Sequence, residues 1–169
     1  MLFRSGTTRI GFSINAEGVI LFGEFDGRST RIIRLQKDQA HQALEAEGRI
    51  EEISARPGNL KSRLKLFYRA GDHIWVSTAE GGERRTLKTE PGRILSPYWT
   101  ANGAAITYLH VPDNPRELVT LREHNPDTDA DTLVARTSQF ISVAPNADTT
   151  VFAGASRSVA SPYILILVK

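Results

Sequence analysis

The sequence predicts an all-β fold made of one four-stranded unit that recurs along the chain. A polar turn returns about every 40–46 residues, and each turn leads into a short strand with apolar and aromatic residues. The turns lie at residues 15–18, 57–59, 101–103 and 145–148, and the strands after them at 19–22, 64–68, 105–109 and 151–153. Four-stranded units at this spacing are typical of β-propeller blades. We therefore predict a partial β-propeller of about four consecutive four-stranded antiparallel blades, the last one incomplete.

The length of the chain limits the number of blades. A propeller of six to eight blades needs roughly 250–340 residues at this period, whereas the chain has 169. Residues 164–169 read as a strand with no turn or polar tail after it. We interpret residues 1–169 as a single propeller fragment that needs missing blades to close its ring. Residues 1–5 have no counterpart in the repeat, and we expect them to be a non-native scar.

The expected blades cover about residues 9–47, 50–91, 93–134 and 138–169. Strands are expected in the first blade at 10–13, 19–22 and 31–35. Residues 37–47 are ambiguous, because Ala40, Ala43 and Leu44 fall at helical spacing. The repeat requires an outer edge strand there, so we expect strand or irregular structure.

The second blade has the clearest pattern. Its strands at 64–68 and 73–77 are joined by a tight hairpin at 69–72, whose glycine suits a positive φ, and 84–87 supplies the fourth strand. The third blade is expected to have strands at 94–99, 105–109, 118–123 and 129–134. The fourth blade continues through 162–168 and lacks its outer strand.

Composition excludes some classes of protein and leaves others open. The chain has no cysteine, so neither disulfides nor a thiolate metal site can form. Its 21 basic and 19 acidic residues give a net charge of +2, which does not favour a nucleic-acid or membrane partner. No run is long enough for a transmembrane helix, and the compartment stays open between periplasm and cytoplasm.

The motif Ser-Pro-Tyr-Trp-Thr-Ala-Asn-Gly at residues 96–103, followed by an apolar strand that ends in an aromatic residue, resembles the repeat of TolB-type (WD-like) propellers. Residues 139–152 repeat it more loosely. Residues 123–129 and 136–158 resemble the oligogalacturonate lyase group of these propellers. That resemblance implies cleavage of pectin oligomers by β-elimination, with a divalent metal such as manganese held by histidines and a glutamine.

Three residues are candidate ligand-binding residues. The resemblance places a histidine ligand of the lyases where this chain has Gln139, and it implies that the other ligands lie after residue 169. His124 precedes Asn-Pro at a strand exit, the kind of loop in which propellers form sites, although a lone histidine is more often structural. Arg157, in a hairpin loop, suits bidentate pairing with a uronate carboxylate, and a solvated loop arginine is the alternative.

Other motifs carry weaker signals. The residues Asp127, Asp129 and Asp131 alternate as in a calcium loop, but Thr132 and Ser138 stand where an EF-hand needs glycine and glutamate. No catalytic residue is identified, since residues 154–158 lack the strand-to-helix context of a nucleophile elbow. The basic cluster of Arg84, Arg85, Lys88 and Arg93 is interpreted as protection of an edge strand, and the aromatic residues that recur with the repeat are interpreted as core.

Three functions follow as hypotheses. The first is a scaffold that binds a protein partner or a small carbohydrate ligand, with no evident cofactor. The second is part of a metal-dependent oligogalacturonate lyase, which would bring manganese with it. The third is the gating propeller of a serine peptidase whose catalytic domain lies outside these residues.

Overall fold

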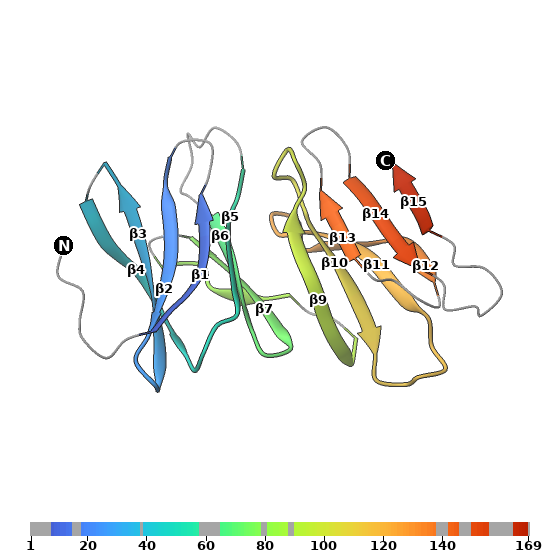
Figure 1. Ribbon diagram of the computed structural model, residues 1–169, viewed down its shortest axis with the longest axis horizontal. Coiled ribbons are helices and arrows are strands. Elements are labelled where there is room, and N and C mark those ends of the chain that lie inside the picture. Colours follow the sequence, from blue (N-terminus) through green and yellow to red (C-terminus); the bar gives the residue numbers. More distant parts are fainter. Residues whose placement is uncertain are drawn as a thin grey trace. The chain divides into compact units, whose positions relative to one another are not determined.

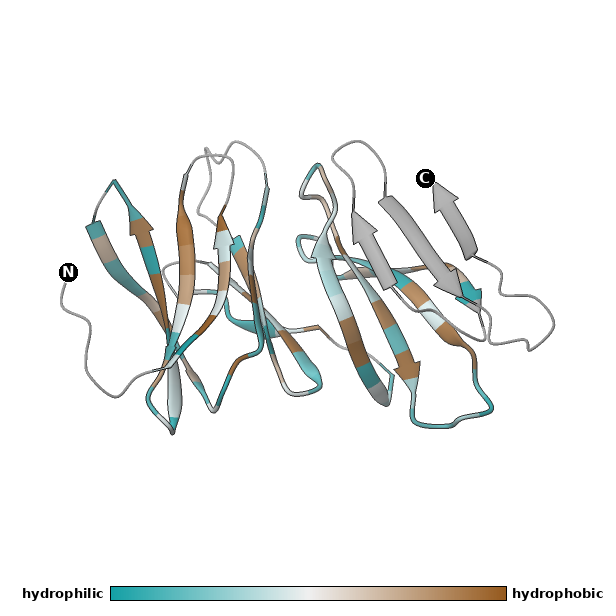
Figure 2. Cartoon of the chain, in the orientation of Figure 1, coloured by the Kyte–Doolittle hydropathy of each residue, from teal (hydrophilic) through white to brown (hydrophobic). Residues whose placement is uncertain are grey.

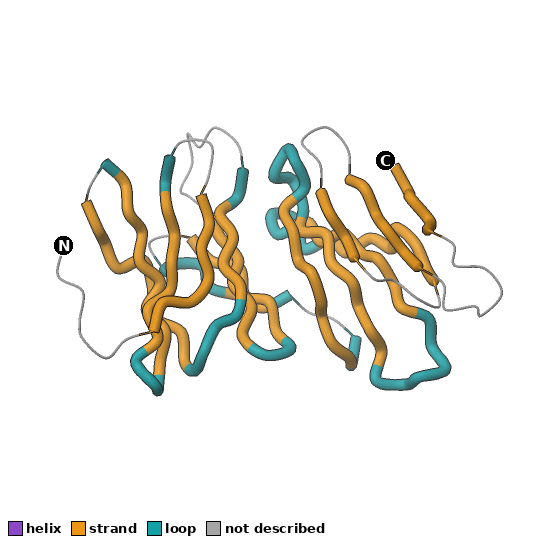
Figure 3. Tube along the Cα trace, viewed as in Figure 1, coloured by secondary structure: helices purple, strands orange, loops and turns teal. Residues whose placement is uncertain are grey.

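The structure is a computed structural model that describes residues 8–14, 18–37, 39–57, 65–78, 81–87, 90–137, 142–145, 150–155 and 164–168, with side chains described up to residue 136. These residues form four antiparallel sheets, each made of strands that are consecutive in the chain (Figure 1). The predicted fold class is confirmed. No helix occurs in the described ranges, so they contain none that is long and apolar enough to cross a membrane (Figure 3).

The first sheet has the order β1-β2-β3-β4. Its strands are β1 (Thr8–Ile14), β2 (Ile20–Phe25), β3 (Ser29–Gln36) and β4 (Gln39–Glu47). The ambiguous stretch at 37–47 thus contains an edge strand, as the repeat required, because pairing with β3 outweighs the helical propensity of its alanines. A β-bulge at Gly11, with φ of +64°, interrupts the register between β1 and β2.

The second sheet has the order β5-β6-β7-β8. Its strands are β5 (Glu52–Ala55), β6 (Lys65–Ala70), β7 (His73–Thr78) and β8 (Arg85–Thr86). Within the first unit of the chain, residues 1–87, this sheet packs on the first through a shared core. That core includes Leu21, Ile32 and Leu66, all fully buried, and each such side chain contributes about 2 kcal/mol of stability.

An aromatic stack extends this core. The rings of Tyr68 and Trp75 stack with centroids 6.4 Å apart, and the guanidinium of Arg84 lies 4.4 Å from the Trp75 centroid. Arg84 also donates to the backbone oxygen of Glu45 in the first sheet. The interpretation of Arg84 as protection of an edge strand stays a prediction, and the structure adds these contacts to it. The cation of Arg84 is held by the face of an aromatic ring, which attracts it electrostatically.

The second unit of the chain, residues 88–169, contains the other two sheets. The third sheet has the order β12-β11-β10-β9, with strands β9 (Gly92–Trp99), β10 (Ile106–Pro112), β11 (Val119–Asn125) and β12 (Ala130–Thr137). A β-bulge in β9, where Ser96 has φ of +49°, matches in kind the bulge in β1. The predicted turn after this strand is present: Ala104 N donates to Asn102 Oδ1, and Gly103 has φ of +68°.

The fourth sheet has three described strands in the order β13-β14-β15. They are β13 (Ser142–Pro145), β14 (Thr150–Ala155) and β15 (Ile164–Val168). The fourth blade was expected to lack its outer strand, and the described residues of this sheet contain none.

Candidate functional site

The three predicted ligand-binding residues have different outcomes. Gln139 and Arg157 lie outside the described residues. His124 lies on β11, where it pairs in register with Ile106 and Asp131. Its side chain is buried, and Nε2 lies 3.5 Å from Asp129 Oδ1. The structure thus places His124 against Asp129 of the same β11–β12 hairpin. Its role in ligand binding stays a prediction.

The acidic turn does not have the geometry of a calcium loop. The backbone amides of Asp127 and Thr128 donate to Asn125 Oδ1, which forms a local turn, and Asp129 faces His124. Within the part of the chain that the structure describes, no three His, Asp or Glu side chains converge on one point. The described residues therefore do not fit the ligand set of a manganese ion.

Asp131 belongs instead to a network inside the third sheet. Its Oδ1 accepts a hydrogen bond from Tyr108 Oη at 2.9 Å, and its Oδ2 lies 2.6 Å from both Nε and Nη2 of Arg122. Burial, and then the charge of Asp131, raises the pKa of Tyr108 well above its usual value. Burial alone would lower the pKa of Arg122, but the hydrogen bond and charge of Asp131 raise it overall. Both carboxylate oxygens are thus engaged within the protein.

An open pocket of about 450 Å³ lies in the first unit of the chain. It is formed by the start of β1, through Arg9, Ile10 and Gly11, and by the connection from β4 to β5, through residues 49–51. Of the lining residues, Ile10 and Ile50 are buried, whereas Arg9 and Arg49 are exposed. The pocket is therefore lined by both apolar and basic residues at the junction of two blades.

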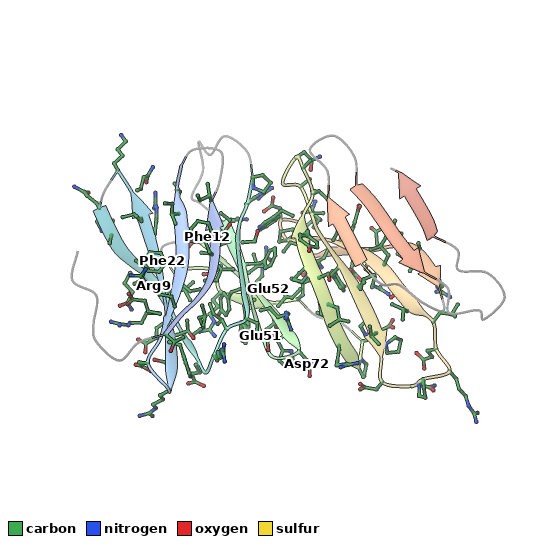
Figure 4. All side chains as sticks on the ribbon, in the orientation of Figure 1. Arg9, Phe12, Phe22, Glu51, Glu52 and Asp72 are labelled. Atoms are coloured by element: carbon green, nitrogen blue, oxygen red, sulfur yellow. The ribbon has the colours of Figure 1, made fainter. Side chains whose placement is uncertain are left out.

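Side chains from the second sheet hold one wall of this pocket. Arg69 forms ion pairs with Glu51 through Nη1 and with Glu52 through Nε, the latter at 3.3 Å. Figure 4 labels the two glutamates. The backbone amide of Glu51 donates to the carbonyl of Arg69 at 2.9 Å. Because Arg69 pairs with the Glu51 carboxylate, the negative charge of this lining residue is compensated within the protein.

The bulge at Gly11 shapes the opposite wall. A Cβ atom at this residue would lie 3.2 Å from Cγ1 of Ile53, in addition to being strained at φ of +64°. Glycine therefore allows β1 to approach β5 closely at the point where the pocket opens.

Such a pocket suits a small anionic ligand. Guanidinium groups form charge-assisted, often bidentate hydrogen bonds with carboxylates, and ligand sites usually combine an apolar lining with a few polar groups. This site was not predictable from motifs, because neither arginine belongs to a recognisable one. The repeat contained a usable signal, since it placed the connection between the first two blades at residues 47–50, which include Arg49.

Comparisons with known proteins identify the fold. Neither a family model nor a curated protein sequence matches the chain. Among solved structures, it is similar to oligogalacturonate lyase from Vibrio parahaemolyticus, with a TM-score of 0.76 and 12% identity over 96% of this chain and 55% of that one. It is also similar to an oligogalacturonate lyase in complex with manganese, with a TM-score of 0.77 and 13% identity over 96% of this chain and 51% of the other.

A third similarity comes from a different kind of protein. A chain of a nidogen/laminin complex matches with a TM-score of 0.61 and 16% identity over 90% of this chain and 60% of that chain. The chain thus spans about half the length of the first two structures that it matches. At these identities the likeness shows the fold alone: a β-propeller architecture that resembles oligogalacturonate lyase.

Proposed function

We propose that the chain is the ligand-binding part of a β-propeller and that a small carboxylate-bearing sugar binds at the pocket between β1 and β5. The observation that carries this proposal is that two arginines, Arg9 and Arg49, are among the residues that line one pocket. The guanidinium groups would bind the carboxylate. A scaffold of this kind needs no catalytic residue.

The experiment compares two sugars that differ at C6, which is a carboxylate in galacturonate and a neutral hydroxymethyl group in galactose. Isothermal titration calorimetry of the chain with galacturonate and with galactose should detect binding of the acid and not of the neutral sugar. Arg49→Gln should weaken binding about tenfold, because one charge-assisted contact contributes roughly 1.5–3 kcal/mol. Arg116→Gln removes an exposed arginine of the third sheet's loop and should leave affinity unchanged. Equal binding of both sugars, or no effect of Arg49→Gln, would contradict the proposal.

A second candidate is part of a metal-dependent oligogalacturonate lyase. The likeness to two such lyases over 96% of this chain supports it. The described residues do not supply the metal ligands, so this function would depend on residues that the structure does not describe. An assay of the chain on oligogalacturonate, with and without added manganese, tests it. Manganese-dependent formation of unsaturated product would favour the lyase over the scaffold.

A further inference from the structure

Arg69 on β6 is not one of the described residues that line the pocket of the first unit, but it contacts one of them twice. Its carbonyl accepts a hydrogen bond from the amide of Glu51 at 2.9 Å, and its Nη1 pairs with Oε2 of the Glu51 carboxylate. Its Nε lies 3.3 Å from Oε2 of Glu52, its register partner on β5. The side chain of Arg69 is 19% exposed, against 47% for Glu51. A largely covered arginine thus fixes the carboxylate of a lining residue.

Glu51 is two residues from Arg49, and both residues line the pocket. Ile50 between them is fully buried, whereas Arg49 and Glu51 are exposed. This alternation of burial is that of an extended chain, in which residues two apart lie on the same side. Figure 2 shows hydrophilic and hydrophobic residues in alternation along strands of this unit. Arg49 and Glu51 therefore share the solvent side of the connection from β4 to β5.

A carboxylate on the same side as Arg49 competes with the ligand for this arginine. A guanidinium group pairs with a carboxylate of the protein through the same charge-assisted hydrogen bonds as with a carboxylate of a ligand. While Glu51 occupied Arg49, the site would be closed to the ligand, and the apparent affinity would fall in proportion. The pairing with Arg69 gives the Glu51 carboxylate a different partner, on another strand.

We propose that Arg69 is a positioning residue for the ligand site: by pairing with Glu51, it keeps this carboxylate from occupying Arg49. Arg69 does not itself bind the ligand. Its second pairing, with Glu52, fixes the guanidinium against β5, so that Glu51 meets a cation whose place is already set. The inference rests on the proposed function, because it takes galacturonate as the ligand of the pocket.

Calorimetric titration with galacturonate tests the proposal through rescue by a second substitution. Arg69→Gln should weaken binding about fivefold, because the released Glu51 carboxylate then pairs with Arg49. Adding Glu51→Gln removes the competing carboxylate and should restore affinity to within about twofold of the wild-type chain. Adding Glu52→Gln instead removes the same charge from the other partner of Arg69 and should not restore it. Arg69→Lys keeps a cation for Glu51 and should weaken binding less than Arg69→Gln.

A measurement on the wild-type chain does not depend on the folding of any variant. In the spectrum of the nitrogen-15-labelled chain, saturating galacturonate should shift the Nε–H resonance of Arg49 and leave that of Arg69 in place, because the pairs of Arg69 persist in the complex. An equal shift of the Arg69 resonance would overturn the proposal. Unchanged affinity in Arg69→Gln, or a loss that Glu51→Gln does not restore or that Glu52→Gln restores equally, would overturn it too. No binding of galacturonate to the wild-type chain would contradict the proposed function itself, on which the inference rests.

Discussion

In both the second and the third sheet a fully buried tyrosine lies on the second strand, but the two tyrosines have different cross-strand partners. Tyr68 lies opposite Trp75, whose ring stacks on it. Tyr108 lies opposite Arg122, and Asp131 accepts hydrogen bonds from both. In the second sheet the tyrosine thus packs against the Trp75 ring and the Arg84 cation. In the third sheet it belongs to a hydrogen-bond network with Asp131 and Arg122.

This difference determines what each hydroxyl contributes. The hydroxyl of Tyr68 forms no hydrogen bond within the described part of the chain, although it is buried. The hydroxyl of Tyr108 is buried to the same degree and has a charged acceptor at 2.9 Å. A buried polar group costs stability unless it is paired. The repeat therefore specifies an aromatic residue at this place in the blade. The neighbouring residues determine whether its hydroxyl has a hydrogen-bond acceptor.

The largest expected difference in the free energy of unfolding is between a substitution of Asp131 in the third sheet and one of Arg84 in the second. Asp131→Ala leaves the Arg122 guanidinium and the Tyr108 hydroxyl without their acceptor, and we expect it to lower the free energy of unfolding by about 2–3 kcal/mol. Arg84→Ala removes an exposed cation from the face of the Trp75 ring and a long hydrogen bond to the backbone oxygen of Glu45, and it should cost about 1 kcal/mol. Urea denaturation measures both. Equal losses would mean that the network in the third sheet is no stronger than the stack.

A smaller difference is expected between the two tyrosines themselves. Tyr108→Phe removes a hydrogen bond to a carboxylate and should cost about 1–2 kcal/mol. Tyr68→Phe removes a hydroxyl that forms no hydrogen bond with the described residues, and stability should change by no more than about 0.5 kcal/mol. The same denaturation experiment checks the pair. A large loss for Tyr68→Phe would show that its hydroxyl has a partner beyond the described residues.

The smallest effect appears only in alkaline solution. Burial raises the pKa of Tyr68 to about 12, against the opposing charge of Arg84. Below the unfolded pKa of about 10 the tyrosine is neutral in both states, and its contribution to the free energy of unfolding is fully present. Between pH 10 and 12 the hydroxyl loses its proton in the unfolded state first, so stability falls as pH rises. The melting temperature of Tyr68→Phe should therefore fall less steeply above pH 10 than that of the wild-type chain. Parallel curves would contradict the raised pKa.

The fold could be predicted from the sequence because its repeat constrains each strand several times over. Residues 37–47 illustrate this: local spacing favoured a helix, but the period required a strand, and β4 is a strand. The network of Tyr108, Arg122 and Asp131 was not predictable, because Asp131 lies 23 residues from Tyr108 and only the register of three strands brings them together. The alternating aspartates at residues 127–131 suggested a cation-binding site instead.

The ligand pocket escaped prediction for a related reason. Arg9 begins one inner strand and Arg49 precedes the next, so the two are close only because β1 and β5 pack together. His124 was a candidate because histidine can bind many ligands, but its side chain is buried beside Asp129. Residue type indicates which chemistry is possible, whereas proximity depends on how successive sheets meet.

The most direct test of the ligand site is a chemical-shift titration of the nitrogen-15-labelled chain with galacturonate. The account predicts saturable shifts at the backbone amides of Gly11, Arg49 and Glu51, which line the pocket, with galactose as the neutral control. The amides of His124 and Asp129, on the hairpin of the third sheet, should not move. Shifts confined to that hairpin, or an absence of shifts at the pocket, would contradict the account.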